Sequence, residues 1–241
     1  MIVMSIAGVD PSAGAGVFAD IKTFQAIGVY GYGVITALTS QNPNKVYSIK
    51  AIESEYVEEQ IDAVLDFHDV EFIKTGMLYS TDTIKTIAKK IKEYDLKAIV
   101  DPVMIATAGG NLAKDDLSHD LNKYLLPKAY LTTPNISEAE KLTNMEIKNV
   151  DDAVISSKIL AKKCNTLITG GHLDGLNTLN IDNNVSIYKQ KLLKTDNLHG
   201  TGCNLSSAIT AYLAKGNDLK KACRNSVGRS EERRVGKECR S

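Results

Sequence analysis

A glycine-rich turn from Gly200 to Gly202 leads directly into Cys203 and a helical pattern. The first N–H groups of a helix have no partner within the helix and attract anions, and glycine lets a ligand approach the backbone closely. We therefore expect Gly200, Thr201 and Gly202 to hold a transferring phosphoryl group. An ordinary turn before a packed helix is the alternative, and it is favoured for a glycine pair that stands alone. The apolar residues that mark one buried face of this helix are Leu205, Ala208, Ile209, Tyr212 and Leu213.

Cys203 is the candidate catalytic residue, because an alcohol that attacks a phosphoryl group must lose its proton. A thiol at a helix N-terminus has a location that lowers its pKa, which favours a thiolate base. In-line phosphoryl transfer otherwise requires positioning and charge neutralisation from the protein, with little covalent chemistry. The alternative is that Cys203 is a small buried residue of the helix.

Apolar runs of strand length alternate with helical patterns, beginning with residues 2–7 and a helix that ends at Gly28. This alternation predicts an α/β fold with a mostly parallel sheet covered by helices on both faces. The runs 178–181 and 185–190 flank a short polar turn, which predicts an antiparallel hairpin at one edge of the sheet. Ligands of such sheets bind beyond the carboxyl ends of the strands. The loops at those ends are residues 8–16, 40–44, 74–77, 101–104, 133–138, with Ser137 as a helix cap, and 170–172.

The chain of 241 residues is long enough for one large domain, which we place at residues 1–228. Residues 229–241 contain five basic and three acidic residues and only two apolar ones, so they cannot cover a core face. We interpret this segment as a foreign or frayed tail; a native, solvated C-terminus is the alternative.

Composition excludes several classes of partner. Lys plus Arg equals Asp plus Glu, 29 of each, so there is no basic field to hold nucleic acid. No apolar stretch has the length of a transmembrane helix, and the N-terminal apolar run lacks a basic segment before it. The four cysteines are widely separated, as is typical of a reducing compartment. We expect a cytoplasmic protein with a small-molecule substrate.

Six motifs occur in the order found in the hydroxymethylpyrimidine and phosphomethylpyrimidine kinases of thiamine biosynthesis, which belong to the ribokinase-like superfamily. They begin at Gly8-Val9-Asp10-Pro11, Thr39-Ser40-Gln41-Asn42, Lys74-Thr75-Gly76-Met77, Asp101-Pro102-Val103-Met104, Thr133-Pro134-Asn135 and His199-Gly200-Thr201-Gly202-Cys203. The chain resembles this family over residues 1–227. The resemblance implies a three-layer α/β/α fold, a homodimer, and transfer of the ATP γ-phosphoryl group to 4-amino-5-hydroxymethyl-2-methylpyrimidine and then to its monophosphate.

Four residues are candidates for binding the pyrimidine, since such a ring needs donor and acceptor groups and an apolar wall. Asp20 is expected to accept a hydrogen bond from the ring amino group, and Gln41 to pair with a ring nitrogen. Gly8 offers backbone groups, and Met77 is expected to lie against the ring face. The alternatives are a solvated helix charge for Asp20, a turn residue for Gln41 and plain core for Met77.

Asp101 and Glu138 are the candidates for Mg²⁺, which we expect to be bound through water, because the ion prefers oxygen ligands and retains several waters. The alternatives are a strand-end acid before proline for Asp101 and a capping carboxylate for Glu138. The residues expected to contact the nucleotide are Asn135, Thr169, Gly171 and Thr201.

Two lysines common in the family are absent here. The neighbourhoods that usually carry them read Ile105-Ala106-Thr107-Ala108 and Ile168-Thr169, so charge neutralisation near the triphosphate is expected to be weaker. Related pyridoxal kinases also have threonine before Gly-Gly, which makes a pyridoxine or pyridoxal kinase the alternative function. The family also continues for further helical turns after Val227, so a ligand-binding protein without turnover is a second alternative.

Overall fold

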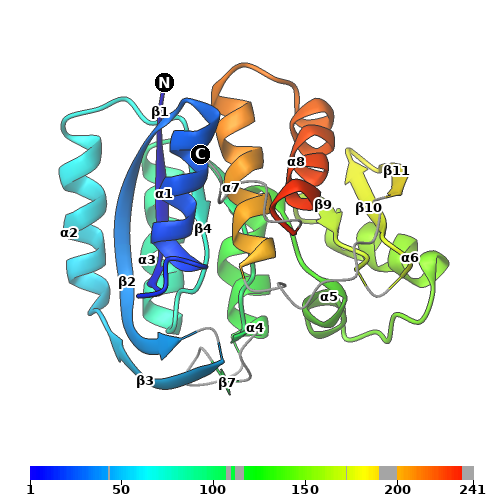
Figure 1. Ribbon diagram of the computed structural model, residues 1–241, viewed down its shortest axis with the longest axis horizontal. Coiled ribbons are helices and arrows are strands. Elements are labelled where there is room, and N and C mark those ends of the chain that lie inside the picture. Colours follow the sequence, from blue (N-terminus) through cyan, green and yellow to red (C-terminus); the bar gives the residue numbers. More distant parts are fainter. Residues whose placement is uncertain (43, 107–109, 112–116, 172, 190–199, 235–241) are drawn as a thin grey trace.

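A nine-stranded sheet forms the centre of the molecule, as a computed structural model shows for residues 1–42, 44–106, 110–111, 117–171, 173–189 and 200–234 (Figure 1). The strand order is β11-β10-β9-β8-β5-β4-β1-β2-β3. The six strands from β9 to β2 in this order are parallel to one another. Their bounds are β1 (Ile2–Val9), β2 (Tyr30–Asn42), β4 (Phe72–Thr75), β5 (Lys97–Val100), β8 (Ala129–Thr132) and β9 (Asn165–Ile168).

Antiparallel strands close the sheet at both edges. The predicted hairpin is confirmed as β10 (Leu176–Ile181) and β11 (Asn184–Lys189), with β10 antiparallel to β9. At the other edge, β3 (Lys45–Ala51) pairs antiparallel with the long end of β2. The sequence did not indicate β3, and residues 40–42 belong to β2 rather than to the predicted loop, because this edge strand has no fully buried residue to give an alternating pattern.

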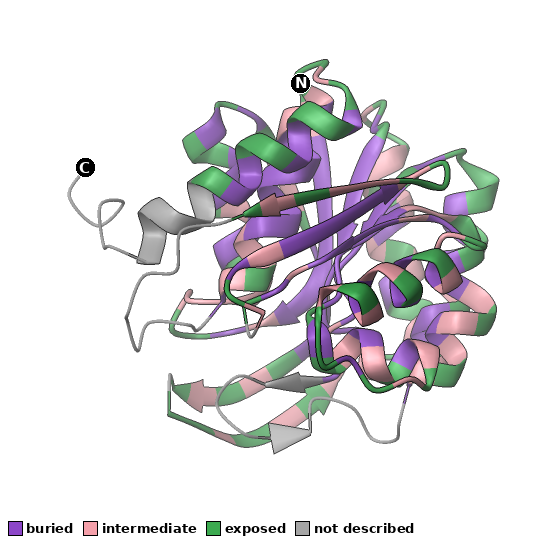
Figure 2. Cartoon of the chain, turned by 90° about the vertical axis from the view of Figure 1, so that its right-hand side faces the viewer, coloured by how far each residue is buried: buried purple, intermediate pink, exposed green. Residues whose placement is uncertain are grey.

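Helices cover both faces of the sheet, which confirms the predicted three-layer architecture. One apolar core lies between the sheet and α1, α7 and α8, and another lies against the helices of the opposite face. Figure 2 shows the buried strands between helices whose outer faces are exposed. The bounds are α1 (Gly16–Ile27), α7 (Thr201–Ala214) and α8 (Leu219–Arg234) on the first face, and α2 (Ser54–Leu65), α3 (Thr81–Glu93), α4 (Ser118–Asp120), a π-helical turn (Leu121–Leu125), a 3-10 turn (Leu126–Lys128), α5 (Ile136–Thr143) and α6 (Val150–Leu160) on the second.

Two further details bear on the sequence-based expectations. A two-stranded sheet forms from β6 (Ile105–Ala106) and β7 (Gly110–Asn111) after β5. Helix α8 continues to Arg234, beyond the domain boundary placed at residue 228, and residues 235–241 lie outside the described part of the chain. The division at residue 228 therefore stays a prediction.

The direction in which strands are added reverses beside β1. From β1 the chain passes to β2 on one side and later to β4 on the other, so β1 lies between them. In open α/β sheets a crevice forms outside the carboxyl ends of strands at such a switch point, and ligands bind there. The fold therefore places the ends of β1, β2 and β4 around a candidate site.

Candidate functional site

A pocket opens at the carboxyl ends of β1, β2 and β4, where the strand order reverses. It brings together three of the four predicted pyrimidine-binding residues, Gly8, Gln41 and Met77, with Cys203 of α7. Asp20 does not line it. The complete lining is Gly8, Val9, Asp10, Ala15, Gly16, Thr39, Gln41, Lys74, Met77, Val103 and Cys203.

Met77 forms an apolar wall that lies directly against the backbone of Gly8. A Cβ atom on Gly8 would lie 2.5 Å from the methyl carbon of Met77, closer than van der Waals contact allows. The hydroxyl of Thr36 donates a hydrogen bond to the Met77 carbonyl oxygen at 2.6 Å, which fixes the loop after β4. A shift in the β2–β3 register between Ser40 and Gln41 sets the place of Gln41 at the pocket rim.

The loop from Asp10 to Gly16 is held by the side chain of Asp10. One Asp10 oxygen accepts hydrogen bonds from the Ser12 N–H and hydroxyl, at 2.9 Å and 2.8 Å, and the other accepts from the Ala15 N–H at 2.9 Å. Asp10 is 2% exposed. The carboxylate thus acts as the centre of the turn that forms one wall of the pocket.

The start of α7 packs directly on this loop. Gly200 is the N-cap residue with φ 72°, and a Cβ atom there would lie 1.8 Å from the carbonyl oxygen of Gly14. Gly202 lies over Asp101, since its Cβ position is 3.8 Å from both carboxylate oxygens. The first turn of α7, with Thr201 half-buried, is thereby placed beside the pocket and the end of β5.

The pKa of the Cys203 thiol is raised, whereas its position at a helix N-terminus predicted a lowered pKa. Burial raises its pKa to about 12, with the charges of Asp101 and Asp20 acting in the same direction and Lys74 in the opposite one. The expectation of a lowered pKa was therefore wrong for the protein without substrates, because desolvation outweighs a helix N-terminus. Cys203 keeps its place in the pocket wall.

A buried ion pair under the pocket is the feature that sequence reasoning missed. Lys74, on β4, and Asp20, on α1, are each 0% exposed, and the ammonium lies 2.9 Å from one Asp20 oxygen. Asp20 therefore contacts Lys74, which lines the pocket, but does not line the pocket itself. A lysine among buried strand residues was the available signal, since lysine is almost never fully buried unless paired.

Asp101 and Glu138, the candidates for Mg²⁺, lie at the end of β5 and in the first turn of α5. Burial raises the pKa of Asp101, which is 3% exposed and accepts a hydrogen bond from the Ser206 hydroxyl at 3.2 Å. Burial and the Asp101 charge raise the pKa of Glu138 to about 8. Two carboxylates close enough for the charge of Asp101 to raise the pKa of Glu138 fit a divalent cation that keeps several waters. Within the described ranges no group of three or more His, Cys, Asp or Glu side chains is arranged for a metal.

Glu138 also belongs to a capping box, which corrects the expected cap of α5. Asn135 is the N-cap residue, and its side chain accepts from the Glu138 N–H at 2.9 Å, while Glu138 accepts from the Asn135 N–H at 2.9 Å. Ser137 was expected in this role and instead lies inside the first turn. The motif S/T/N-x-x-E was present in the sequence from Asn135 to Glu138.

Asn135 and Thr169, two of the predicted nucleotide contacts, lie side by side at the ends of β8 and β9. They form a parallel bridge in which the Thr169 N–H donates to the Pro134 carbonyl oxygen at 2.9 Å. Gly171 is exposed, and a Cβ atom there would meet nothing within 4 Å. These residues continue the same edge of the sheet beyond Asp101, and they do not line the pocket at the ends of β1, β2 and β4.

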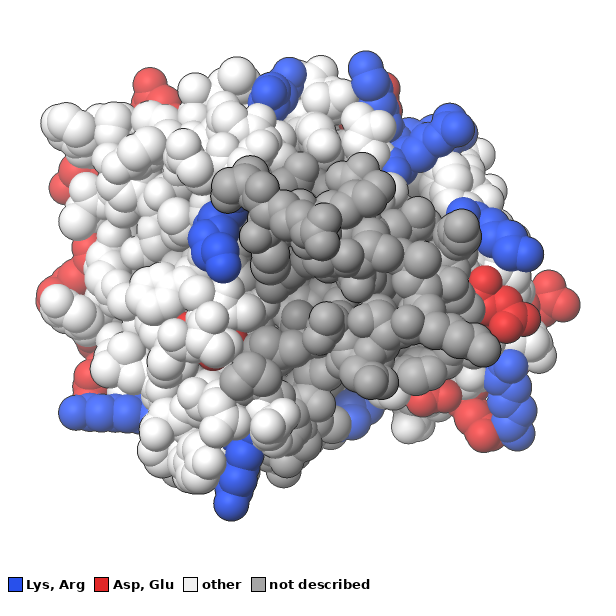
Figure 3. Space-filling view, viewed as in Figure 1, with Lys and Arg blue, Asp and Glu red and all other residues white. Residues whose placement is uncertain are grey.

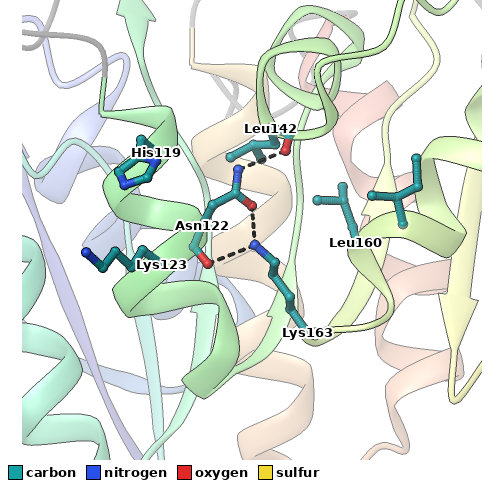
Figure 4. A pocket seen from close by; sticks show the side chains of 7 residues that line it. His119, Asn122, Lys123, Leu142, Leu160 and Lys163 are labelled. Atoms are coloured by element: carbon teal, nitrogen blue, oxygen red, sulfur yellow. Dashed lines mark hydrogen bonds between the residues drawn. The ribbon is translucent and has the colours of Figure 1, made fainter.

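A second hollow lies among the helices of the second face, between the π-helical turn and the ends of α5 and α6 (Figure 4). The Lys163 ammonium donates to the backbone and side-chain oxygens of Asn122 at 2.8 Å and 2.9 Å, and the Asn122 amide donates to the Leu142 carbonyl oxygen at 2.8 Å. These bonds tie the π-helical turn to the ends of two helices. None of the predicted site residues lies there.

Comparisons with known proteins identify the family to which the chain is similar. The family model for phosphomethylpyrimidine kinase matches residues 10–228. A hydroxymethylpyrimidine/phosphomethylpyrimidine kinase of Bacillus subtilis (strain 168) is 39% identical over 226 residues, 91% of this chain and 83% of the relative. One of Rhizobium meliloti (strain 1021) is 41% identical over 229 residues, 92% of this chain and 85% of the relative.

Two solved structures share the fold closely. The phosphomethylpyrimidine kinase of Clostridium difficile 630 superposes with a TM-score of 0.85 and 39% identity, over 96% of this chain and 98% of that one. The ADP complex of Bacillus subtilis pyridoxal kinase superposes with a TM-score of 0.85 and 34% identity, over 93% and 88%. Both the three-layer fold and the antiparallel hairpin are therefore those of ribokinase-like vitamin kinases.

Proposed function

The chain belongs to the phosphomethylpyrimidine kinase family, and from this premise we propose how its site works. It phosphorylates 4-amino-5-hydroxymethyl-2-methylpyrimidine and then the monophosphate, with ATP as donor, in thiamine biosynthesis. The observation that carries the site assignment is the pocket in which Cys203 faces the same space as Gln41 and Met77. ATP use is supported by the related pyridoxal kinase that binds ADP.

The hydroxymethyl oxygen of the substrate attacks the γ-phosphorus of ATP. A new oxygen–phosphorus bond forms while the bond to the bridging oxygen breaks, and its electron pair leaves on ADP. The hydroxyl proton passes to the sulfur of Cys203 in its thiolate form. Gly200, Thr201 and Gly202 present the first N–H groups of α7 to the phosphoryl oxygens, and Asn135, Thr169 and Gly171 hold the nucleotide.

Gln41 and Met77 select the ring. A side-chain amide supplies both a donor and an acceptor, as an aminopyrimidine edge requires, while the thioether packs on the ring face. Gly8 lines the same pocket and offers its backbone groups to the ring. Pyridoxine or pyridoxal kinase remains a second candidate function, because a pyridoxal kinase superposes as closely as the pyrimidine kinase does.

An assay with three acceptors tests this function. With ATP and Mg²⁺ present, we expect kcat/KM for the hydroxymethylpyrimidine and its monophosphate to exceed that for pyridoxine by at least about tenfold, since a site built to hydrogen-bond one ring rejects another. Coupled release of ADP is the measurement. Faster turnover of pyridoxine would establish the second candidate, and binding of the pyrimidine without ADP release would identify a binder without turnover.

We propose that Asp101 and Glu138 hold Mg²⁺ through water, and that the ion neutralises charge on the transferring phosphate. Replacing Asp101 by asparagine is expected to raise the Mg²⁺ concentration for half-maximal rate by roughly tenfold or more, because groups around a bound metal commonly contribute that much to affinity. Titration of the rate with Mg²⁺ measures it. The exposed carboxylate of Asp82 on α3 offers a control, since Asp82→Asn should leave the titration unchanged. An unchanged titration in both Asp101→Asn and Glu138→Gln would exclude these ligands.

We also propose a cytoplasmic homodimer. None of the helices described is long and apolar enough to cross a membrane. Basic and acidic side chains are interspersed around the face shown in Figure 3, without one field of a single sign among the residues coloured there. This distribution favours a small-molecule substrate over nucleic acid. Sedimentation analysis of the pure protein tests the dimer.

A further inference from the structure

Lys74 is a fully buried lysine whose side chain lines the pyrimidine pocket. Its ammonium lies 2.9 Å and 3.1 Å from the two carboxylate oxygens of Asp20 and 4.0 Å from Asp101. Of the described residues that line the pocket, Lys74 alone is a lysine or arginine. Burying an ion pair costs more free energy than burying apolar side chains of similar size in many proteins. A buried pair kept at the floor of a site therefore points to a role in that site.

We propose that Lys74 is a catalytic residue that stabilises negative charge on the attacking oxygen, and that Asp20, Ser5 and Ser207 are positioning residues that hold its ammonium in place. This inference rests on the proposed kinase function and deepens it. As the oxygen–phosphorus bond forms and the hydroxyl proton leaves for Cys203, the acceptor oxygen carries developing charge. Lys74 remains an ammonium throughout and exchanges no proton.

The support beneath Lys74 comes from three separate elements. Asp20 accepts a hydrogen bond from the Ser5 hydroxyl of β1 at 2.5 Å and from the Ser207 hydroxyl of α7 at 2.6 Å. With the two contacts to Lys74, the carboxylate is fixed from β1, β4 and α7 at once. Donors fixed before the reaction cost no reorganisation during it, which is the main source of electrostatic catalysis.

Neighbouring carboxylates keep the Lys74 ammonium charged, and Gly76 leaves room for it. Burial alone would lower the pKa of Lys74, but the Asp20 carboxylate, with Cys203 and Asp101, holds it above its ordinary value. A Cβ atom on Gly76 would lie 2.9 Å from the Lys74 nitrogen, so glycine leaves room for the ammonium at the strand end.

The test removes both charges of the pair together. The double variant Lys74→Met with Asp20→Asn leaves neither partner of the ion pair as a buried unpaired charge, although Asp101, 4.0 Å from Lys74, also loses this cation. The protein should unfold within about 5 °C of the wild type. We expect kcat to fall by roughly 10² for the alcohol and for the monophosphate, with KM changed less than about threefold. Ser207→Ala, which only loosens Asp20, should lower kcat by about tenfold at constant KM.

Two further variants separate catalysis from folding. Lys90→Met removes another buried lysine, paired with Asp62 at 2.7 Å between α2 and α3, and should lower the melting temperature while kcat stays within about twofold. Lys74→Ala leaves space for ethylammonium, which should restore part of kcat in a saturable manner; a structural role would not respond to the amine.

The results that overturn the inference differ from those that overturn the function. A double variant with kcat within threefold of the wild type, or with only a raised KM for the monophosphate, would show that Lys74 does not stabilise the reacting oxygen. Absence of rescue in a folded Lys74→Ala protein would count against it equally. Wild-type protein that phosphorylates neither pyrimidine would overturn the kinase function itself, and this role with it.

Discussion

Replacing Cys203 by alanine is expected to lower kcat for the hydroxymethylpyrimidine by roughly 10³- to 10⁴-fold, and to lower kcat for the monophosphate less, because the attacking phosphate oxygen is already ionised at neutral pH. The physical reason is the loss of the group that accepts the hydroxyl proton, since general bases contribute up to about that factor. KM for both acceptors should change little, because Gly8, Gln41 and Met77 still form the ring site. Steady-state kinetics with each acceptor provide the measurement.

Cys223 offers the matched control for this prediction. It is a fully buried cysteine on α8, among apolar residues of the core, so Cys223→Ala should lower stability and leave kcat within about twofold. A Cys203→Ala protein that retains more than a tenth of the wild-type kcat for the hydroxymethylpyrimidine would show that the proton leaves by another route, and that Cys203 is a packing residue.

The pH dependence follows from the same thiol. With the pKa of Cys203 at about 12, the thiolate fraction rises tenfold for each pH unit across the range in which the protein is assayed. Log kcat should therefore rise with pH between 7 and 9 without a plateau, unless product release limits turnover. A plateau near neutral pH, seen also in single-turnover measurements, would mean that bound substrates lower this pKa or that another base acts.

Residues of the pocket could be predicted where a residue type suited to binding or catalysis stands at the carboxyl end of a predicted strand or at the start of a predicted helix. Gly8, Gln41, Met77 and Cys203 each follow or face the carboxyl end of an element that the alternating pattern indicates. Parallel strands bring such ends to one edge of the sheet, so the sequence alone implies their proximity. The sequence does not imply how deeply each side chain is buried, and burial determines in which direction its pKa shifts.

Asp20 and Lys74 illustrate the part that could not be predicted. On the sequence, Asp20 stands in a helical pattern where a solvated charge and a ligand look alike, and Lys74 stands in a motif at a strand end. Their pairing joins residues 54 positions apart, which only the packing of α1 and α7 on the sheet determines. The prediction of a lowered pKa for Cys203 was wrong for the same reason. The position of a residue in a helix can be inferred from the local sequence, whereas its burial depends on the whole fold.

Replacing Gly200 by alanine is expected to lower kcat by about 10²- to 10³-fold and to destabilise the protein. Its φ of 72° is unfavourable for alanine by roughly 1–2 kcal/mol, and the new Cβ atom would lie 1.8 Å from the Gly14 carbonyl oxygen. The N-terminus of α7 must therefore move by an ångström or more, and displacements of that size cost about 10² in rate. Kinetics and thermal unfolding of the same preparation measure both effects.

A Gly216→Ala variant is the control that separates backbone strain from the steric clash with the Gly14 carbonyl oxygen. It has φ 82°, after the end of α7, and a Cβ atom there would meet nothing within 4 Å. Gly216→Ala should therefore lose only the roughly 1–2 kcal/mol of the left-handed conformation, with kcat unchanged. Equal losses of stability in the two variants, together with wild-type kcat in Gly200→Ala, would contradict the prediction.

The comparison matters because Gly14 belongs to the loop that Asp10 holds at the pyrimidine pocket. A backbone contact joins this loop to the first turn of α7. In the proposed site, this contact would set the distance between the acceptor and the phosphoryl group, because backbone atoms adapt less than side chains do. A rate loss in Gly200→Ala at unchanged KM for the pyrimidine is the expected mark of that coupling, since ring binding would survive while alignment would not.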